Sequence, residues 1–240
     1  MFKRKYNPLG FMKGEVEQGT HIVMLYEKIS DLLEIFPSFF ASGLKNNELC
    51  IVVYPNTALK QKIKKEISRI VDLQKYTKEK KIEFIHYKTF YFKNNIFTKE
   101  KVYRLIDKKL NSIGFKDIDG IRAAGDMSWV KSKLLKKVLV YEKGLTEKYS
   151  KRLILLMCTY PVKNISIPDL IDVIQSHNMI LYKTDKKWHL SEPTERRILK
   201  SEVENLEKFT KFATNRELKM IELKERIAKL EKQLNLKIKK

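Results

Sequence analysis

The stretch HIVMLYEKISDLLEIFPSFFASGLKNNELCIVVY, residues 21–54, indicates the fold. It opens and closes on compact apolar runs of strand length, His21–Tyr26 and Leu49–Tyr54. Between them, apolar residues recur at helical spacing over residues 30–42, and Gly43 stands where a helix would stop. The unbroken hydrophobicity of the second run is typical of a strand buried on both faces. The stretch therefore predicts a strand, a helix and a second, parallel strand.

The same alternation continues along the chain. Further strands are expected at residues 82–87, 118–124 and 152–160, further helices at 56–73, 98–110, 129–149 and 166–176, and a closing hairpin at 179–190. Strands that alternate with helices of this length predict an α/β fold, a three-layer αβα domain with a mostly parallel central sheet over residues 20–192. Residues 1–19 hold three glycines and show no sustained period, so a flexible N-terminal arm is expected there.

The segment 193–240 has a different character. Residues 195–240 contain no proline or glycine and predict one long C-terminal helix. Its apolar residues follow two seams. The first is Val203, Leu206 and Ala213, broken by Thr210, and the second, with spacings of three and four, is Met220, Leu223, Ile227, Leu230 and Leu234. This period favours a coiled coil with a second copy (a homodimer) or with a signalling protein. A helix that packs back on its own domain is the alternative.

The net charge of +21 raises the question of nucleic acid. Of the 50 basic residues, however, 41 are lysines and 9 are arginines, and the excess is spread along the chain. Planar guanidinium groups favour recognition of phosphates and bases, whereas surface lysines commonly solvate a face. A nucleic-acid partner is therefore an alternative that the composition does not favour.

The two cysteines cannot form a disulfide framework, which indicates a reducing, cytoplasmic compartment. The longest apolar run, Leu153–Cys158, is far shorter than the ~20 residues of a membrane-spanning helix. No apolar segment follows the basic N-terminus, so neither a signal peptide nor a membrane location is expected.

Motifs for common chemistries are missing. The turn after the first strand, Tyr26–Asp31, has no glycine, and its acidic side chains would repel a phosphate. No Gly-Lys pair occurs in the chain, which disfavours ATP hydrolysis of the usual kind. The four histidines (His21, His86, His177, His189) and two cysteines (Cys50, Cys158) are scattered, so we expect no metal. A composite Cys/His site remains the alternative, because strand ends converge in space.

Arg122 lies in an otherwise mostly apolar strand and needs a carboxylate partner or an anionic ligand. An ion pair with Asp126, an ion pair with Glu142 and a ligand site are all open. Other polar residues stand at predicted strand ends, where folds of this class bind ligands.

Several segments, in order, resemble the MEDS (methanogen/methylotroph, DcmR sensory) domain family. They are residues 21–26, 39–44 and 48–52, then 122–129 with Arg122, Asp126, Met127 and Trp129, then Tyr141-Glu142, Leu156–Tyr160 and His177. The resemblance implies a RecA/KaiC-type fold that lacks its phosphate loop. Carried over residue by residue, the ligand-binding positions are His21, Tyr26, Arg122, Asp126, Trp129, Cys158, Tyr160 and His177.

The resemblance further implies a sensory protein that is not an enzyme, binds a small organic ligand without a cofactor, and feeds a regulator. We expect the signal to pass through the C-terminal helix. The rival hypotheses are a RecA-like ATPase with a divergent phosphate site and a basic nucleic-acid-binding module.

Overall fold

The computed structural model describes residues 6–113, 118–193, 210, 214 and 216–227. The chain divides into two units, Met1–Pro193 and Thr194–Lys240. The first unit holds the sheet and the helices that cover it.

A seven-stranded sheet forms the centre of the first unit, in the order β11-β10-β3-β9-β8-β4-β5. Its strands are β3 (His21–Tyr26), β4 (Glu48–Tyr54), β5 (Ile82–His86), β8 (Gly120–Asp126), β9 (Ile154–Pro161), β10 (Met179–Thr184) and β11 (Lys187–Ser191). All neighbours pair in parallel except β10 and β11, which form the predicted hairpin. The predicted α/β class and parallel sheet are confirmed.

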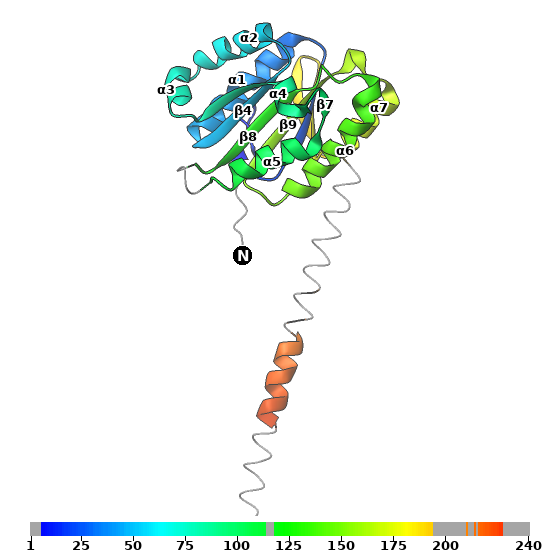
Figure 1. Ribbon diagram of the computed structural model, residues 1–240. Helices are drawn as coiled ribbons and strands as arrows, with labels where there is room; N and C mark the ends of the chain where they lie inside the picture. Colours follow the sequence, from blue (N-terminus) through cyan, green and yellow to red (C-terminus); the bar gives the residue numbers. More distant parts are fainter. Residues whose placement is uncertain (1–5, 114–117, 194–209, 211–213, 215, 228–240) are drawn as a thin grey trace, which may run out of the picture. The chain divides into compact units, whose positions relative to one another are not determined.

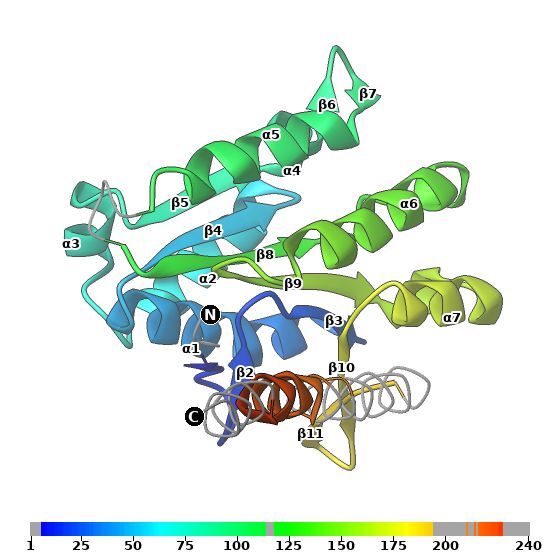
Figure 2. The same cartoon turned by 90° about the horizontal axis from the view of Figure 1, so that it is seen from below.

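Helices cover both faces of this sheet (Figures 1 and 2). They are α1 (Ile29–Lys45), α2 (Thr57–Ser68), α3 (Leu73–Lys78), α4 (Tyr87–Tyr91), α5 (Lys99–Leu110), α6 (Ser132–Tyr149), a 3-10 turn at Val162–Asn164, and α7 (Ile167–Gln175). One apolar core lies between the sheet and α1, α2; a second lies between the sheet and α5, α6. Two small ribbons, β1 (Tyr6–Pro8) with β2 (Glu15–Glu17) and β6 (Phe92–Lys93) with β7 (Ile96–Phe97), complete the unit.

Side chains alternate between the two cores along each strand. In β9, Leu155 and Met157 belong to the core under α1, whereas Leu156 and Cys158 belong to the core under α6. This alternation decides which polar side chains of the sheet can meet.

The N-terminal segment corrects the expectation of a flexible arm. Residues 6–17 contain the β1–β2 ribbon, and Leu9 is fully buried. The Asn7 amide donates to the Glu48 carboxylate, which ties the ribbon to β4. The glycines of this segment serve a tight turn and close packing. Gly10 has a φ of +87°, and a Cβ at this position would collide with the Ser38 carbonyl of α1.

Arg122 is fully buried on the α1 side of β8. Its Nε donates to Glu48 Oε2 at 2.5 Å, and its Nη1 donates to the carbonyls of Pro8 and Phe39, each at 3.0 Å. The ion pair is therefore with Glu48. Both partners proposed from the sequence, Asp126 and Glu142, are wrong predictions. Glu48 opens a neighbouring strand, and a contact across strands leaves no spacing pattern in the sequence.

Gly43 also has a different role from the one predicted. It lies inside α1, which runs on to Lys45, and does not end the helix. A Cβ at this position would approach Arg122 Cδ and Nε at 2.8 Å and Cys50 Sγ at 2.9 Å. Glycine is required because the guanidinium passes directly against the helix.

In the second unit, residues 216–227 are helical. The seam residues Met220, Leu223 and Ile227 are about half exposed, at 51%, 47% and 54%. The remainder of the predicted seams lies outside the described residues. No helix in the described part of the chain combines the length and apolar character needed to cross a membrane.

We predict that Glu48→Gln lowers the free energy of unfolding by about 3–5 kcal/mol, because it leaves the Arg122 guanidinium buried without its counter-charge. Urea titration of the wild type and variant measures the difference. Glu83→Gln is the control, since the Glu83–Lys109 pair is partly exposed and should contribute at most about 1 kcal/mol. Equal losses in the two variants would contradict this assignment.

Candidate functional site

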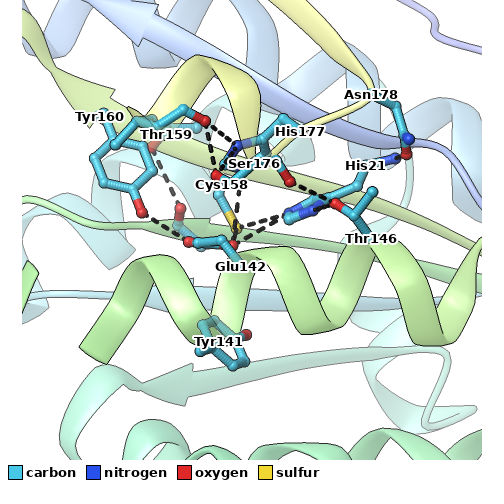
Figure 3. Close-up of polar contacts among 12 residues, drawn as sticks. His21, Tyr141, Glu142, Thr146, Cys158, Thr159, Tyr160, Ser176, His177 and Asn178 are labelled. Carbon is cyan, nitrogen blue, oxygen red and sulfur yellow. Dashed lines mark hydrogen bonds and ion pairs between the residues drawn. The ribbon is translucent and has the colours of Figure 1, made fainter. Parts of the chain in front are cut away.

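A buried polar cluster lies between α6 and the sheet (Figure 3). It combines His21 at the start of β3, Glu142 in the middle of α6, Cys158 and Tyr160 on β9, and His177 just after α7. Each of these side chains is at least 95% buried. Four of the eight sequence-predicted site residues are thus brought together, around a glutamate that was not among them.

The Glu142 carboxylate is the centre of this cluster. Tyr160 Oη donates to its Oε1 at 2.7 Å, and Cys158 Sγ donates to its Oε2 at 3.2 Å. On the other side, His21 Nε2 lies 3.3 Å and His177 Nε2 lies 3.7 Å from Oε2. One carboxylate oxygen therefore faces a thiol and two imidazoles at once.

Hydrogen bonds behind the two histidines fix how the rings are protonated. His177 Nδ1 lies 2.7 Å from the Val173 carbonyl, which can only accept, so Nδ1 carries the proton. Thr146 Oγ1 donates to the Ser176 carbonyl at 2.6 Å and must therefore accept from His21 Nδ1 at 2.9 Å. In their neutral forms, both rings consequently turn the Nε2 lone pair toward Glu142, and His21 Nε2 also lies 3.3 Å from Cys158 Sγ.

Burial favours the uncharged forms of Glu142, Cys158, Tyr160 and His177 by shifting their pKa values. It raises the pKa of Glu142, although His177, Tyr160 and Cys158 act in the opposite direction. Burial and the nearby carboxylate raise the pKa of Cys158 and of Tyr160 well above their usual values. Burial, with His21 next to it, lowers the pKa of His177 to about 3.

The cluster has the donor set of a metal site. One ligand atom from each of His21, Glu142, Cys158 and His177 lies within 4.8 Å of every other. His177 Nε2 has no hydrogen-bond partner among the described residues. Chemically, such a cluster can hold protons or coordinate a cation.

The remaining sequence-predicted residues lie elsewhere. Tyr26 and Asp126 point to the α1 face: Tyr26 Oη donates to Asp126 Oδ1 at 3.0 Å. Asp126 also accepts from the backbone N–H of Ser128 at 3.0 Å, and so holds the loop that follows β8. Burial raises the pKa of Asp126. Arg122 lies farther back on the same face, with Glu48.

Trp129 belongs to an aromatic group that it forms with residues of α4 and of the β6–β7 ribbon. It stacks on Tyr87 with ring centroids 5.3 Å apart and lies 4.9 Å from the Tyr91 ring. Phe92 and Phe97 surround it. Its buried Nε1 has no partner in the part of the chain that the structure describes.

A small hollow opens at the carboxyl ends of β8 and β9, with room of about 40 Å³. Its lining consists of Met127, Ser128, Val130, Lys131, Ser132, Leu135, Tyr160, Pro161, Ile165 and Asp169. Tyr160 is the sequence-predicted residue that lines it. Because the Tyr160 hydroxyl binds Glu142, the hollow and the polar cluster share one side chain.

A wider, open depression lies between α2 and α3. It is lined by Gln61, Lys64, Lys65, Ser68, Leu73, Gln74, Thr77 and Lys78. No sequence-predicted site residue and no group with a marked pKa shift lines it, so it is the weaker candidate for a ligand site.

Glu142 and Thr146 were missed as site residues, although the sequence carries a signal for both. The buried face of α6 includes Leu135, Val138, Leu145 and Tyr149, and Glu142 and Thr146 occupy positions in the same stripe. A carboxylate inside an apolar helical stripe requires an internal partner. That signal could have placed Glu142 opposite the sheet.

The sequence of the first unit matches the model of one protein family over residues 20–178, which is more than half of the chain: the methanogen/methylotroph, DcmR sensory domain. The chain belongs to the MEDS family. The comparison with curated proteins found no match.

Solved structures with the same fold support the RecA/KaiC-like assignment of this MEDS domain. The KaiC-like protein PH0186 from Pyrococcus horikoshii OT3 is 12% identical, with a TM-score of 0.51, and the match covers 80% of this chain and 91% of that one. The uncharacterised protein PH0321 from Pyrococcus horikoshii, solved with an unknown peptide, is 16% identical, with a TM-score of 0.51 and coverage of 74% and 84%. At this identity, the likeness shows the fold.

In this MEDS domain, a carboxylate of the chain lies at the start of α1, the helix that follows the first strand of the sheet. The helix after the first strand is a common anion site, because its first N–H groups point at the ligand. Here Asp31 Oδ2 accepts from the N–H groups of Glu27 and Lys28 at 3.1 and 2.9 Å, and Lys183 lies 3.3 Å from Oδ1. The side chain of Asp31 therefore takes two backbone N–H groups of the turn between β3 and α1.

We predict that Asp31 contributes stability at neutral pH that is lost in acid. Burial acts to raise its pKa, but the N–H groups of Lys28 and Glu27 and the Lys183 ammonium lower the pKa overall. A lowered folded-state pKa gives stability that is present above the unfolded value of about 3.9 and lost as the pH falls through the folded value.

Asp31→Asn should accordingly lower the urea midpoint of the MEDS domain at pH 7, and this difference from the wild type should shrink below about pH 4. Urea titrations at several pH values measure it. A difference that stays constant down to pH 2 would contradict the assignment.

Proposed function

We propose that this protein is a non-enzymatic sensor whose MEDS domain binds a small organic molecule in the hollow at the ends of β8 and β9. The observation that carries this proposal is the double role of Tyr160. Its ring lines the hollow, while its hydroxyl donates to Glu142 at 2.7 Å. A molecule in the hollow would thus touch the same side chain that the buried polar cluster holds in place.

The size and lining of the hollow favour a compact ligand with an apolar part. A volume of about 40 Å³ holds about three waters, by the measure of about 10–15 Å³ for each. Met127, Leu135 and Ile165 supply apolar wall, and Lys131 offers a positive charge. These features fit a molecule of a few non-hydrogen atoms with one polar or anionic end.

The signal would leave through the elements that meet at the hollow. The loop before α6, the end of β9 and the first turn of α7 all contribute to its lining. Binding there would order these segments and shift the population of their packed arrangements. We propose that residues 193–240, which follow β11 in the sequence, pass this change to a second copy or a signalling partner in the cytoplasm.

A sensory role fits better than ATP turnover, because the Asp31 carboxylate binds the turn between β3 and α1 and its charge opposes a nucleotide phosphate there. It also fits better than nucleic-acid binding, because the basic depression between α2 and α3 lacks interleaved aromatic side chains among its lining residues.

We predict that Ser132→Phe abolishes ligand binding, because Ser132 lines the hollow and is exposed at its rim. The matched control is Lys136→Phe, which places the same ring on an exposed position one turn along α6. A library of compounds with a few non-hydrogen atoms each is screened by thermal shift, where a ligand at 100 times its Kd stabilises by about 2.7 kcal/mol.

Fragments that raise the Tm of the wild type and of Lys136→Phe should leave the Tm of Ser132→Phe unchanged. Equal shifts in all three proteins would place the binding site elsewhere and contradict the proposal.

We also predict that Leu223→Glu disrupts self-association, because Leu223 lies in the apolar seam of the C-terminal helix. Ile221→Glu is the matched control: Ile221 is about as exposed as Leu223, at 54% against 47%, but it lies outside the seam. Multi-angle light scattering of the full chain should give a dimer for the wild type and the control, and a monomer for Leu223→Glu. A monomeric wild type would contradict a coiled coil between two copies of this chain.

A further inference from the structure

We propose that His21, Glu142, Cys158 and His177 form a four-coordinate site for Zn²⁺ in the core under α6. The four residues are far apart in sequence and come from four different segments of the fold. Their donor atoms are His21 Nε2, Glu142 Oε2, Cys158 Sγ and His177 Nε2 (Figure 3).

The spacing of these atoms fits tetrahedral zinc. Zinc bonds of about 2.0–2.3 Å place the ligand atoms of a tetrahedron about 3.3–3.8 Å apart. Glu142 Oε2 lies 3.2 Å from Cys158 Sγ, 3.3 Å from His21 Nε2 and 3.7 Å from His177 Nε2, and His21 Nε2 lies 3.3 Å from Cys158 Sγ. The remaining pairs lie within 4.8 Å, so small side-chain movements suffice.

The hydrogen bonds around the histidines are those that metal sites need. A coordinating imidazole turns one lone pair to the metal and donates its other N–H to a fixed acceptor. His177 donates to the Val173 carbonyl, and His21 donates to Thr146, which the Ser176 carbonyl holds in turn. Both Nε2 lone pairs are therefore already directed at one point.

A second observation marks that point as a cation site. His177 Nε2 is fully buried, faces the carboxylate, and has no hydrogen-bond partner among the residues described. The 3.7 Å between His177 Nε2 and Glu142 Oε2 is too long for a hydrogen bond even from a protonated carboxyl, and the Cys158 thiol brings one proton, which goes to Glu142 or to His21. Buried acceptors that face each other without protons are costly.

The charges of the ligands match a divalent ion. Zn²⁺ would displace the Cys158 thiol proton, and the resulting thiolate together with the Glu142 carboxylate would neutralise both positive charges of the metal. A neutral assembly suits a core without solvent. Thiolate and imidazole donors select zinc over magnesium or calcium, which prefer oxygen ligands.

Four protein ligands leave no open position, so the site is of the structural kind. It would join β3 and β9 to α6 and to the turn after α7. The inference goes beyond the proposed ligand binding and does not depend on the hollow, because none of the four ligand residues lines it.

The first test uses the full-length wild type, purified from cells grown with added zinc and freed of any histidine tag. Inductively coupled plasma mass spectrometry should find about one zinc per chain. Replacement by Co²⁺ should give the visible bands of a tetrahedral ion and a thiolate-to-cobalt charge-transfer band. A folded wild type that binds neither metal overturns the proposal.

A matched pair of variants tests the thiol ligand, and a third tests the hydrogen bond behind His21. Cys158→Ala should abolish the charge-transfer band, whereas Cys50→Ala, which removes the other fully buried thiol, should keep it. Thr146→Val should keep the band and weaken metal affinity about 10- to 100-fold, as loss of an outer hydrogen bond to a ligand does.

Glu142→Gln separates a metal site from a purely structural cluster. The amide can still accept from Tyr160 while its NH₂ group donates to a histidine nitrogen, so the metal-free variant should fold and keep the Tm of the metal-free wild type or exceed it. It should lose zinc and the Tm increase that zinc gives the wild type. Equal zinc affinity in Glu142→Gln and the wild type overturns the proposal, and the thermal shifts by organic fragments report separately on the hollow.

Discussion

Because helices cover both faces of the central strands, every polar side chain that points from those strands must find its partner inside the protein. This constraint explains the two buried polar systems. On the α1 face, Arg122 pairs with Glu48 and donates hydrogen bonds to the carbonyls of Pro8 in β1 and Phe39 in α1. On the α6 face, His21, Cys158 and Tyr160 all turn to Glu142. The alternation of side chains along the strands keeps the two systems apart.

Much of the fold could be predicted from the sequence. The apolar runs and helical spacings locate the strands and long helices. The helix expected from residue 56 begins at Thr57, and Asn56 caps it by accepting from the Leu59 N–H. The errors share a cause. Gly43 was interpreted from local preference as a helix end, but a side chain from a distant strand passes there and requires a glycine. Local patterns do not reveal such tertiary contacts.

The candidate site was predictable in part. Resemblance singled out His21, Cys158, Tyr160 and His177, which do come together, and also Tyr26, Arg122, Asp126 and Trp129, which lie elsewhere. The register in which β3, β9 and β8 pair decides which of these side chains lie on the same face at the same height. These strands are neighbours in the sheet but distant in the sequence, and local sequence patterns do not reveal their register. Scattered histidines and cysteines suggested isolated structural roles, whereas the parallel sheet brings three of the six within reach of one carboxylate.

The β1–β2 ribbon shows that the evolutionary boundary and the physical boundary of this domain differ. The match to the family begins at residue 20, yet Asn7 and Pro8 supply hydrogen bonds to the buried Glu48 and Arg122. A fragment cut at the start of the family match would expose a charged pair and the cavity left by Leu9 to water. The cooperative folding unit is therefore larger than the segment that sequence similarity delimits, and studies of isolated MEDS domains should include the residues that precede the match.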